Sequence, residues 1–410
     1  MRGRRQLLTT AAIGAVTLVL AACGGSSSGG ATGGSATGGA SSAAEAAKPP
    51  AVPMADAVGA GEGKLNLIAW AGYAEDGTTD KSVDWVTPFE KASGCQVNVK
   101  IGNTSDEMVT LMKTGQYDGV SASGDATLRL IYGGDVAPVN TSLVPSYADI
   151  APFLKDKAWN SVGGQMYGIP HGWGANVLLY NKKVVDPAPT SWGAVFDPAS
   201  PYKGKISAYD SPIYIADAAL YLKATKPDLK ITNPYELDQT QFDAAVALLK
   251  QQRGVVGEYW SDYTKATASI ESGNTVLTTS WQVIANLVTA GKKADIGTVL
   301  PTEGATGWSD TWMVASKAQN PNCMYKWLDW IAGPQAQAQV AEWFGEAPAN
   351  VKACDLTTDK AHCETYHATD AAYAEKIAYW TTPLAGCGDE RGNVCKDYSE
   401  WTKAWTDIKG

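Results

Sequence analysis

The feature that most constrains the fold is a regular alternation of short apolar segments with longer amphipathic ones, which begins near residue 64. LNLIAW (65–70), CQVNVKI (95–101) and YDGVSAS (117–123) have the composition and alternation of strands. Residues 80–94 and 104–116, which lie between them, have apolar residues at helical spacing. Strands that alternate with helices in this way predict a parallel α/β sheet.

A second run of predicted strands and helices fills residues 166–350, with strands that end at Asp210 and Trp281. Residues 351–410 differ from both runs, because they combine four cysteines with little helical pattern before a final Trp-rich helix. We therefore expect a disulfide-bearing cap at the end of the chain. A length of 410 residues also predicts more than one domain.

Large aromatic and polar residues stand where the predicted strands end. Trp70 and Tyr73 follow the first strand, and Ser123 ends the third. Ligands of parallel α/β sheets bind at the carboxyl ends of strands, so these side chains are candidates for a ligand site. Since an indole ring suits both a core and a half-wet binding wall, each tryptophan also has an alternative role in the core.

The N-terminus predicts export. Three arginines precede an apolar stretch at 7–20, which is too short to span a bilayer. The following residues, Leu20-Ala21-Ala22-Cys23, resemble a bacterial lipobox, in which the cysteine is lipidated and becomes the first mature residue. We therefore expect a signal peptide at 1–22 and a membrane anchor at Cys23, with a plain secretory signal as the alternative.

A Gly/Ser/Ala/Thr-rich stretch follows the cysteine. Residues 23–63 have almost no large apolar side chains and cannot bury a core, so we expect a disordered tether. A lipid at Cys23 with this tether would place a folded region at the outer face of a membrane, as a cell-surface or periplasmic lipoprotein. The composition leaves open whether export is by the general or the twin-arginine route.

The mature chain is acidic. Without residues 1–22, 30 Lys and Arg stand against 42 Asp and Glu, for a net charge of −12. This balance argues against nucleic acid as a partner and is compatible with a cationic ligand. An acidic surface that only keeps the protein soluble is the alternative.

Six cysteines remain in the mature chain, and an even number in an exported protein predicts disulfides. Six cysteines allow 15 connectivities. In the cap, two pairs of cysteines are close in sequence and are each expected to form a disulfide, which leaves two cysteines that are far apart in sequence. The cysteines are Cys95 with Cys323, Cys354 with Cys363, and Cys387 with Cys395. The alternative, a metal site in HCETYH (362–367), fits no common zinc spacing, so we expect neither metal nor cofactor.

Ordered segments of the chain resemble the extracellular substrate-binding proteins of bacterial ABC importers, and within them the spermidine/putrescine-binding group. The resemblance covers about residues 64–350. It rests on the order of AWAGY, FEKASGCQV, YDGVSASGD, MYGIPHGWGANVLLYN, TSWGAVFDP, SIESGNTVLTTSW, WSDTWMVASKAQNP and WLDWIAGPQAQAQVAEWFGEAPAN. The cap beyond residue 351 is not part of the pattern.

The resemblance implies the two-lobe α/β fold of periplasmic binding proteins, type II, in which strands cross a hinge and the ligand lies between the lobes. Lobe one is expected at 64–172 plus 310–410, and lobe two at 173–309. A disulfide between Cys95 and Cys323 would then brace one lobe without locking the hinge.

The resemblance also implies a set of ligand-binding residues. A polyamine needs aromatic faces for its methylenes and ammonium groups and carboxylates for its charges. The residues at matching positions, together with further candidate acids, are Trp70, Tyr73, Ser123, Asp125, Asp210, Trp260, Trp281, Trp308 and Asp310.

Some of these residues have simpler alternative roles. Asp210 could cap the helix that follows it, and Asp310 could be a turn residue. His171 and Trp173, on the expected crossing strands, could serve the hinge rather than the ligand.

Some acids that the resemblance implies are replaced in this chain, so the set of carboxylates does not identify the ligand. The acid expected three residues after Asp210 falls on Ile213 or its neighbour Tyr214, and an expected cleft tyrosine falls on Asp125. The acid expected near the end of the Trp281 strand is replaced around Gln282 or Val283. Besides putrescine and spermidine, an ω-amino acid, another amino acid or a quaternary amine therefore remains an alternative ligand.

The function expected from the resemblance is capture of a small cationic amine outside the cell and delivery to ABC-transporter permease subunits, by a monomer without enzymatic activity. The sequence contains no G-x-S-x-G or H-E-x-x-H motif and only three histidines. A surface interaction lipoprotein without a small ligand is the alternative from another class.

Overall fold

The computed structural model describes residues 48–410. The predicted signal peptide, the candidate lipidation site Cys23 and most of the predicted tether lie outside the described residues. Within 48–410, no helix has both the length and the apolar composition needed to cross a bilayer.

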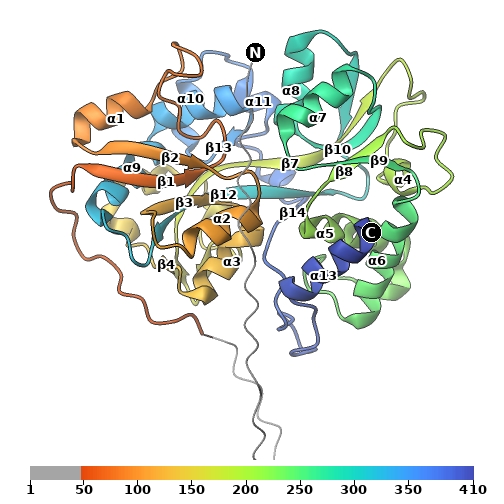
Figure 1. The fold of residues 1–410 in the computed structure, drawn as a ribbon, viewed down its shortest axis with the longest axis horizontal. Helices are drawn as coiled ribbons and strands as arrows, with labels where there is room; N and C mark the ends of the chain where they lie inside the picture. The colour runs from red at the N-terminus through yellow and green to blue at the C-terminus, as the bar shows by residue number, and fades with distance from the viewer. Residues whose placement is uncertain (1–47) are drawn as a thin grey trace, which may run out of the picture. The chain divides into compact units, whose positions relative to one another are not determined.

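The first half of the molecule is built on a parallel sheet, as the alternation predicts (Figure 1). Strand β1 lies between β2 and β3, and Leu67 of β1 is in register with Val99 of β2. The elements in chain order are β1 (Lys64–Ala69), α1 (Val86–Ser93), β2 (Gln96–Ile101), α2 (Ser105–Met112), β3 (Gly119–Ala122), α3 (Gly124–Gly133) and β4 (Val136–Ala137).

Two long antiparallel strands connect this half to the rest of the sheet. They are β7 (Ile169–Asn181) and β12 (Ala305–Ala315), paired from Ile169–Trp312 to Ala175–Gly307. β12 also pairs with β3, and β7 pairs with β10, so the strand order is β2-β1-β3-β12-β7-β10-β8-β9. These are the crossing strands that the resemblance implies.

The second half is another α/β unit. β8 pairs in parallel with both β9 and β10. Because these strands end at Tyr209, Trp260 and Trp281, their carboxyl ends bring large rings to one edge. The elements are α4 (Gly193–Phe196), β8 (Ile206–Tyr209), α5 (Ile215–Thr225), α6 (Gln239–Gln252), β9 (Val256–Trp260), α7 (Tyr263–Glu271), β10 (Leu277–Trp281), α8 (Gln282–Gly291) and β11 (Ile296–Val299).

After β12 the chain returns to the first half. There α9 (Pro321–Ala332) packs against α1 and β1, and α10 (Pro334–Phe344) follows it. A disulfide joins Cys95, beside β2, to Cys323 in the first turn of α9. The other two pairs are Cys354–Cys363 and Cys387–Cys395, which is the expected pairing.

The end of the chain differs from the expected cap on lobe one. Strand β14 (Ile377–Tyr379) pairs with β12, and the last helix, α13 (Tyr398–Lys409), packs against α6 in the second half (Figure 1). The reason is an apolar face of α13, where Trp401 lies 5.9 Å from the ring of Phe242.

The last part of the predicted tether is also ordered. Glu62 accepts hydrogen bonds from the backbone N–H groups of Asn322 and Cys323, at the N-terminus of α9. Asn140 donates to the carbonyl of Ala55 at 3.2 Å. Residues 55–62 are therefore fixed to the first half by these contacts, which their Gly-rich composition does not reveal.

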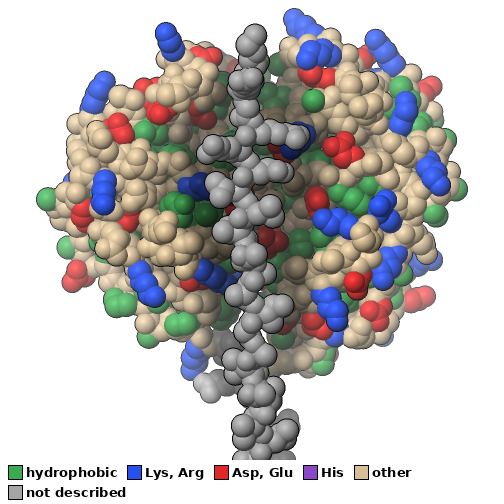
Figure 2. Space-filling view, in the orientation of Figure 1, with side chains coloured by type: hydrophobic (Ala, Val, Ile, Leu, Met, Phe, Trp, Pro, Cys, Tyr) green, Lys and Arg blue, Asp and Glu red, His purple; other side chains and the backbone are tan. Residues whose placement is uncertain are grey.

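The chain has 15 tryptophans against 5 phenylalanines, and some of the tryptophans lie in the core whereas others line the site. Six indoles are almost completely buried away from the cavity described below, and these belong to Trp85, Trp173, Trp192, Trp312, Trp327 and Trp401. On the uncovered part of the face in Figure 2, basic and acidic side chains are interspersed and form no single basic patch.

Candidate ligand-binding site

The turn after β1 directs two aromatic side chains inward. The backbone N–H of Tyr73 donates to the carbonyl of Trp70 at 3.2 Å, and Gly72 has a φ of +94°. A tight turn of this kind needs a glycine at the position with positive φ. Tyr73 is fully buried and Trp70 is 8% exposed, so the segment is the wall of an interior site rather than a polar loop.

A cavity lies where the strand ends of both halves meet. Trp70 and Ser123 reach it from the first half, Trp281 from the second, and Trp308 and Asp310 from the crossing strand β12. Six of the nine predicted ligand residues line this cavity together. The complete lining is Trp70, Ala71, Tyr73, Ser123, Tyr263, Trp281, Trp308, Asp310, Phe344 and Trp380.

The aromatic lining residues pack edge to face. The rings of Trp70 and Trp281 have centroids 6.3 Å apart and planes at 77°, although they come from opposite halves. Trp308 and Phe344 are 6.1 Å apart at 88°. Ring faces around a buried volume can bind methylenes and, through their quadrupoles, cations.

Asp310 is the acid of the cavity. The Ser123 hydroxyl donates to its Oδ1 at 2.5 Å, and the Tyr73 hydroxyl donates to its Oδ2 at 2.8 Å. Burial raises the pKa of Asp310 to about 6, while these two hydrogen bonds act in the opposite direction. At neutral pH the carboxyl is therefore mainly ionised and provides a buried negative charge beside the aromatic rings.

Glu346 lies behind Tyr73 and is a second buried acid of the same network. Its Oε2 is 2.9 Å from the Tyr73 hydroxyl oxygen. Burial, and then the charge of Asp310, raise the pKa of Glu346 well above its usual value. One phenol O–H can donate to only one acceptor at a time. The arrangement is therefore satisfied when a protonated Glu346 donates to Tyr73 and Tyr73 donates to Asp310.

His171, on β7, lies beside Glu346, and its imidazole ring is neutral. Burial lowers the pKa of His171 to about 3. The Gln337 amide nitrogen lies 3.1 Å from His171 Nδ1, and its oxygen accepts from the Ala349 N–H, so the amide is oriented to donate to Nδ1. The imidazole proton is therefore on Nε2, which lies 3.7 Å from Glu346 Oε1.

Three predicted residues do not line this cavity. Trp260 lies behind Trp281, with ring centroids 5.0 Å apart. Asp125 is buried under α2, where it accepts from the Ser105 hydroxyl at 2.8 Å, and burial raises its pKa to about 7. Both side chains therefore lie outside the lining of this cavity, unlike the six predicted residues that meet there.

Asp210 is the third, because a partner distant in sequence binds it. Lys409 Nζ and Trp405 Nε1, both on α13, lie 2.7 and 2.9 Å from its Oδ1. It does not cap the following turn either, since the Ser211 side chain does so.

Besides Ala71, four residues of the site were not predicted from the sequence. Glu346 stands within GEAPAN, where an acid between apolar neighbours was a usable signal. Tyr263 and Phe344 are the first and last residues of helices, and nothing in the local sequence marks them. Trp380 follows the short apolar strand IAY in the segment expected to be a disulfide-bearing cap on lobe one. Among residues 48–410, no group of three or more His, Cys, Asp or Glu could hold a metal ion.

Curated proteins with similar sequences are polyamine-binding proteins by name. The chain is 24% identical over 305 residues to the putrescine/cadaverine-binding protein of Pseudomonas aeruginosa, a match covering 71% of this chain and 80% of that protein. It is 27% identical over 307 residues to the spermidine/putrescine-binding periplasmic protein of Escherichia coli, covering 72% and 84%.

Solved structures confirm the predicted two-lobe fold. The spermidine/putrescine ABC transporter substrate-binding protein PotD of Streptococcus pneumoniae matches with a TM-score of 0.65 at 18% identity, over 84% of this chain and 97% of that one. The family model of the bacterial extracellular solute-binding proteins matches residues 84–366. The chain therefore belongs to the bacterial extracellular solute-binding protein family.

Proposed function

We propose that this protein captures a small cationic amine outside the cell and delivers it to the permease of an ABC importer. The observation that carries the proposal is the buried carboxyl group of Asp310 among the aromatic rings of the cavity. A carboxylate forms charge-assisted hydrogen bonds with an ammonium group, and indole faces attract the same charge and the methylenes next to it. The names of the curated relatives support the same ligand class.

Capture would be coupled to hinge closure. Trp70 and Ser123 belong to the first half, whereas Trp281 and Tyr263 belong to the second. A ligand that contacts both halves only when they are closed shifts the population to the closed state. We propose that one lobe comprises residues 64–172 and 310–380, and the other residues 173–309 and 381–410. Residues 381–410 are assigned to the second lobe because α13 packs against α6.

A diamine such as putrescine is the first candidate ligand, with one ammonium on Asp310 and its chain along the rings. An ω-amino acid is the second. Trp70 and Trp308 have buried indole N–H groups with no hydrogen-bond partner among residues 48–410. A ligand carboxylate could accept from these donors, whereas a second ammonium could not.

The location and assembly belong to the same proposal. A lipid on Cys23 would hold the protein at the outer face of the membrane, near the permease. The protein would act as a monomer and catalyse no reaction, and ATP hydrolysis would take place in another subunit of the importer.

Calorimetric titration tests the proposal on the exported full-length protein, with Cys23→Ser to keep it free of the membrane. Putrescine, cadaverine, spermidine, 4-aminobutyrate and glycine betaine are compared at pH 8. We expect micromolar or tighter binding of a diamine, lost in Asp310→Asn and retained in the surface control Asp243→Asn. Binding of 4-aminobutyrate alone would select the second candidate. If none of the five produces heat, the proposed ligand class is wrong.

A further inference from the structure

A segment outside the family-matched residues 84–366 contributes to the cavity. We call residues 377–410 the C-terminal strap. It begins as β14, paired with β12 from Ala305–Ile377 to Gly307–Tyr379. Directly afterwards, the backbone N–H of Trp380 donates to the carbonyl of Gly307 at 2.7 Å. These bonds fix the start of the strap on a crossing strand, beside the cavity.

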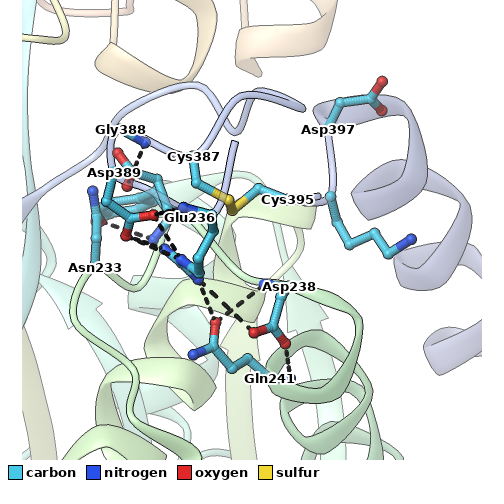
Figure 3. Close-up of a disulfide and its surroundings, with 12 residues drawn as sticks. Asn233, Glu236, Asp238, Gln241, Cys387, Gly388, Asp389, Cys395 and Asp397 are labelled. Carbon is cyan, nitrogen blue, oxygen red and sulfur yellow. Dashed lines mark hydrogen bonds and ion pairs between the residues drawn. A yellow bond between two sulfur atoms is a disulfide. The ribbon is translucent and has the colours of Figure 1, made fainter. Parts of the chain in front are cut away.

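The strap is attached firmly to the second half. Its Cys387–Cys395 loop faces the start of α6 (Figure 3), where Arg391 donates to Gln241 Oε1 at 3.0 Å. The backbone N–H of Gly388 donates to Glu236 at 3.0 Å. Helix α13 adds further attachments, among them the Trp401 ring on Phe242 and the Lys409–Asp210 ion pair.

Fewer contacts join the strap to the first half. The ring of Tyr379 stacks on that of Trp159 with centroids 4.7 Å apart, and the contacts made after Trp380 are on α3. The Thr382 hydroxyl lies 3.2 and 2.9 Å from the carbonyl oxygens of Gly124 and Asp125. The Arg129 guanidinium lies 4.1 Å from the ring centroid of Tyr398.

Close backbone packing supports the same contact with α3. A Cβ atom at Gly124 would lie 1.8 Å from the Trp380 carbonyl oxygen, so only glycine permits this approach. The strap therefore touches both halves, but it is held much more strongly by the second.

Trp380 is the strap residue that reaches the cavity. Its ring stacks on Tyr209 with centroids 5.7 Å apart and planes at 8°, and it lies 6.5 Å from the ring of Trp281. It is 2% exposed. The ring is thus supported from behind by the second half and presents a fixed surface to the cavity.

We propose that Trp380 is a specificity-determining residue that limits the length of the ligand, and that the contacts of Thr382 and Tyr398 with α3 latch the strap in the closed protein. The inference rests on the proposed function, since it concerns the same cavity. Because the strap is held by the second half, opening of the hinge would break the α3 contacts. Ligand release would then require the latch to open.

A ladder of diamines tests the role of Trp380 in the full-length Cys23→Ser protein. 1,3-Diaminopropane, putrescine, cadaverine and 1,6-diaminohexane are titrated into wild type, Trp380→Ala and Trp380→Phe. Removal of the ring should weaken the best wild-type diamine about tenfold, the size of one aromatic–cation contact, and move the preference to a longer diamine. Trp380→Phe should lie between, and it decides the question if Trp380→Ala does not fold. Trp343→Ala, on the exposed side of α10, is the matched control.

The latch is tested by release kinetics. Thr382→Val removes the hydroxyl at nearly constant volume, so the dissociation rate of putrescine, followed by stopped-flow tryptophan fluorescence, should rise about threefold to tenfold. Thr402→Val, on the exposed face of α13, should leave it unchanged.

The outcomes separate the two levels of the proposal. If wild type binds no diamine, the proposed function falls and this inference with it. If wild type binds but both Trp380 variants keep its order of preference, only the role of Trp380 is overturned. An unchanged release rate in Thr382→Val overturns the latch.

Discussion

The hydroxyl of Tyr73 donates to Asp310 at 2.8 Å across 237 residues of sequence. This bond joins the turn after β1 to the crossing strand β12, and it orients the only carboxylate among the cavity-lining residues. Because the second oxygen of Asp310 is held by Ser123, the charge is fixed in position before a ligand arrives. Fixed charges lose little entropy on binding.

Tyr73→Phe should therefore weaken amine binding. The substitution keeps the ring in its packed position but removes a hydrogen bond to a charged group, which contributes roughly 1.5–3 kcal/mol. We expect a loss of about tenfold to a hundredfold in calorimetric affinity at pH 8. Tyr202→Phe, which changes a tyrosine that does not line the cavity, is the control. Equal affinities in both variants would contradict a role for this bond.

Amine binding should depend on pH through Asp310. Its pKa is raised to about 6 by burial, and only the ionised form attracts a cation. Affinity should therefore be constant above about pH 7 and fall as pH decreases through 6, approaching tenfold per pH unit. Near pH 6, binding should release about half a proton, which titrations in buffers of different ionisation enthalpy measure. A flat profile between pH 5 and 8 would show that Asp310 is not the binding acid.

The free energy of unfolding of Glu346→Gln, relative to that of wild type, should increase as the pH rises. Burial raises the pKa of Glu346 in the folded state, so the folded protein binds the proton more tightly than the unfolded chain. The free energy of unfolding of wild type should then fall as pH rises above the unfolded pKa of about 4.5.

Glutamine imitates the neutral carboxyl and removes this part of the pH dependence. Urea denaturation of both proteins from pH 5 to pH 8 measures the difference. Glu346→Ala, which leaves a buried void, should be less stable than Glu346→Gln by about 2–3 kcal/mol at every pH. Parallel stability profiles for wild type and Glu346→Gln would argue against a protonated Glu346.

Asp210→Asn should leave diamine affinity within about twofold. The side chain of Asp210 is bound to Lys409 at 2.7 Å, outside the cavity lining. The pair is partly exposed, so its loss should cost less than about 1 kcal/mol of stability. Lys409→Met should have the same small effect. A tenfold or greater loss of affinity in Asp210→Asn alone would instead place this carboxylate at the ligand.

Cys95→Ser with Cys323→Ser should lower stability without changing affinity. The disulfide closes a loop of 228 residues and should contribute roughly 3–5 kcal/mol to the free energy of unfolding. It joins β2 and α9 within one half, so the hinge and the cavity are not constrained by it. A change in putrescine affinity that exceeds about threefold would indicate coupling between this disulfide and closure.

The strand-end rule explains why part of the site was predictable. Trp70, Ser123 and Trp281 are placed by local patterns, since each stands where an apolar strand ends and the sheet brings such ends together. The alternation of strands and helices predicts the sheet in the same way. Local patterns do not reveal the long-range contacts of a side chain, which is why Asp210 was expected at the ligand although Lys409 binds it.

The C-terminal strap shows the same limit. IAY at 377–379 is too short to be distinguished from a loop, and its pairing with β12 depends on residues about 70 positions earlier. Trp380 was therefore assigned to the cap and not to the ligand site. The Gly-rich composition of 48–63 predicted disorder, whereas ordered contacts with Asn140 and Asn322 decide the structure there.

A crystal structure of the protein with putrescine at pH 8 tests the central claim most directly. The account predicts one ammonium nitrogen roughly 3 Å from a carboxylate oxygen of Asp310, with the methylenes between the rings of Trp70, Trp281 and Trp380. A diamine bound against Asp210 with Lys409 displaced, or bound outside this cavity, would contradict it.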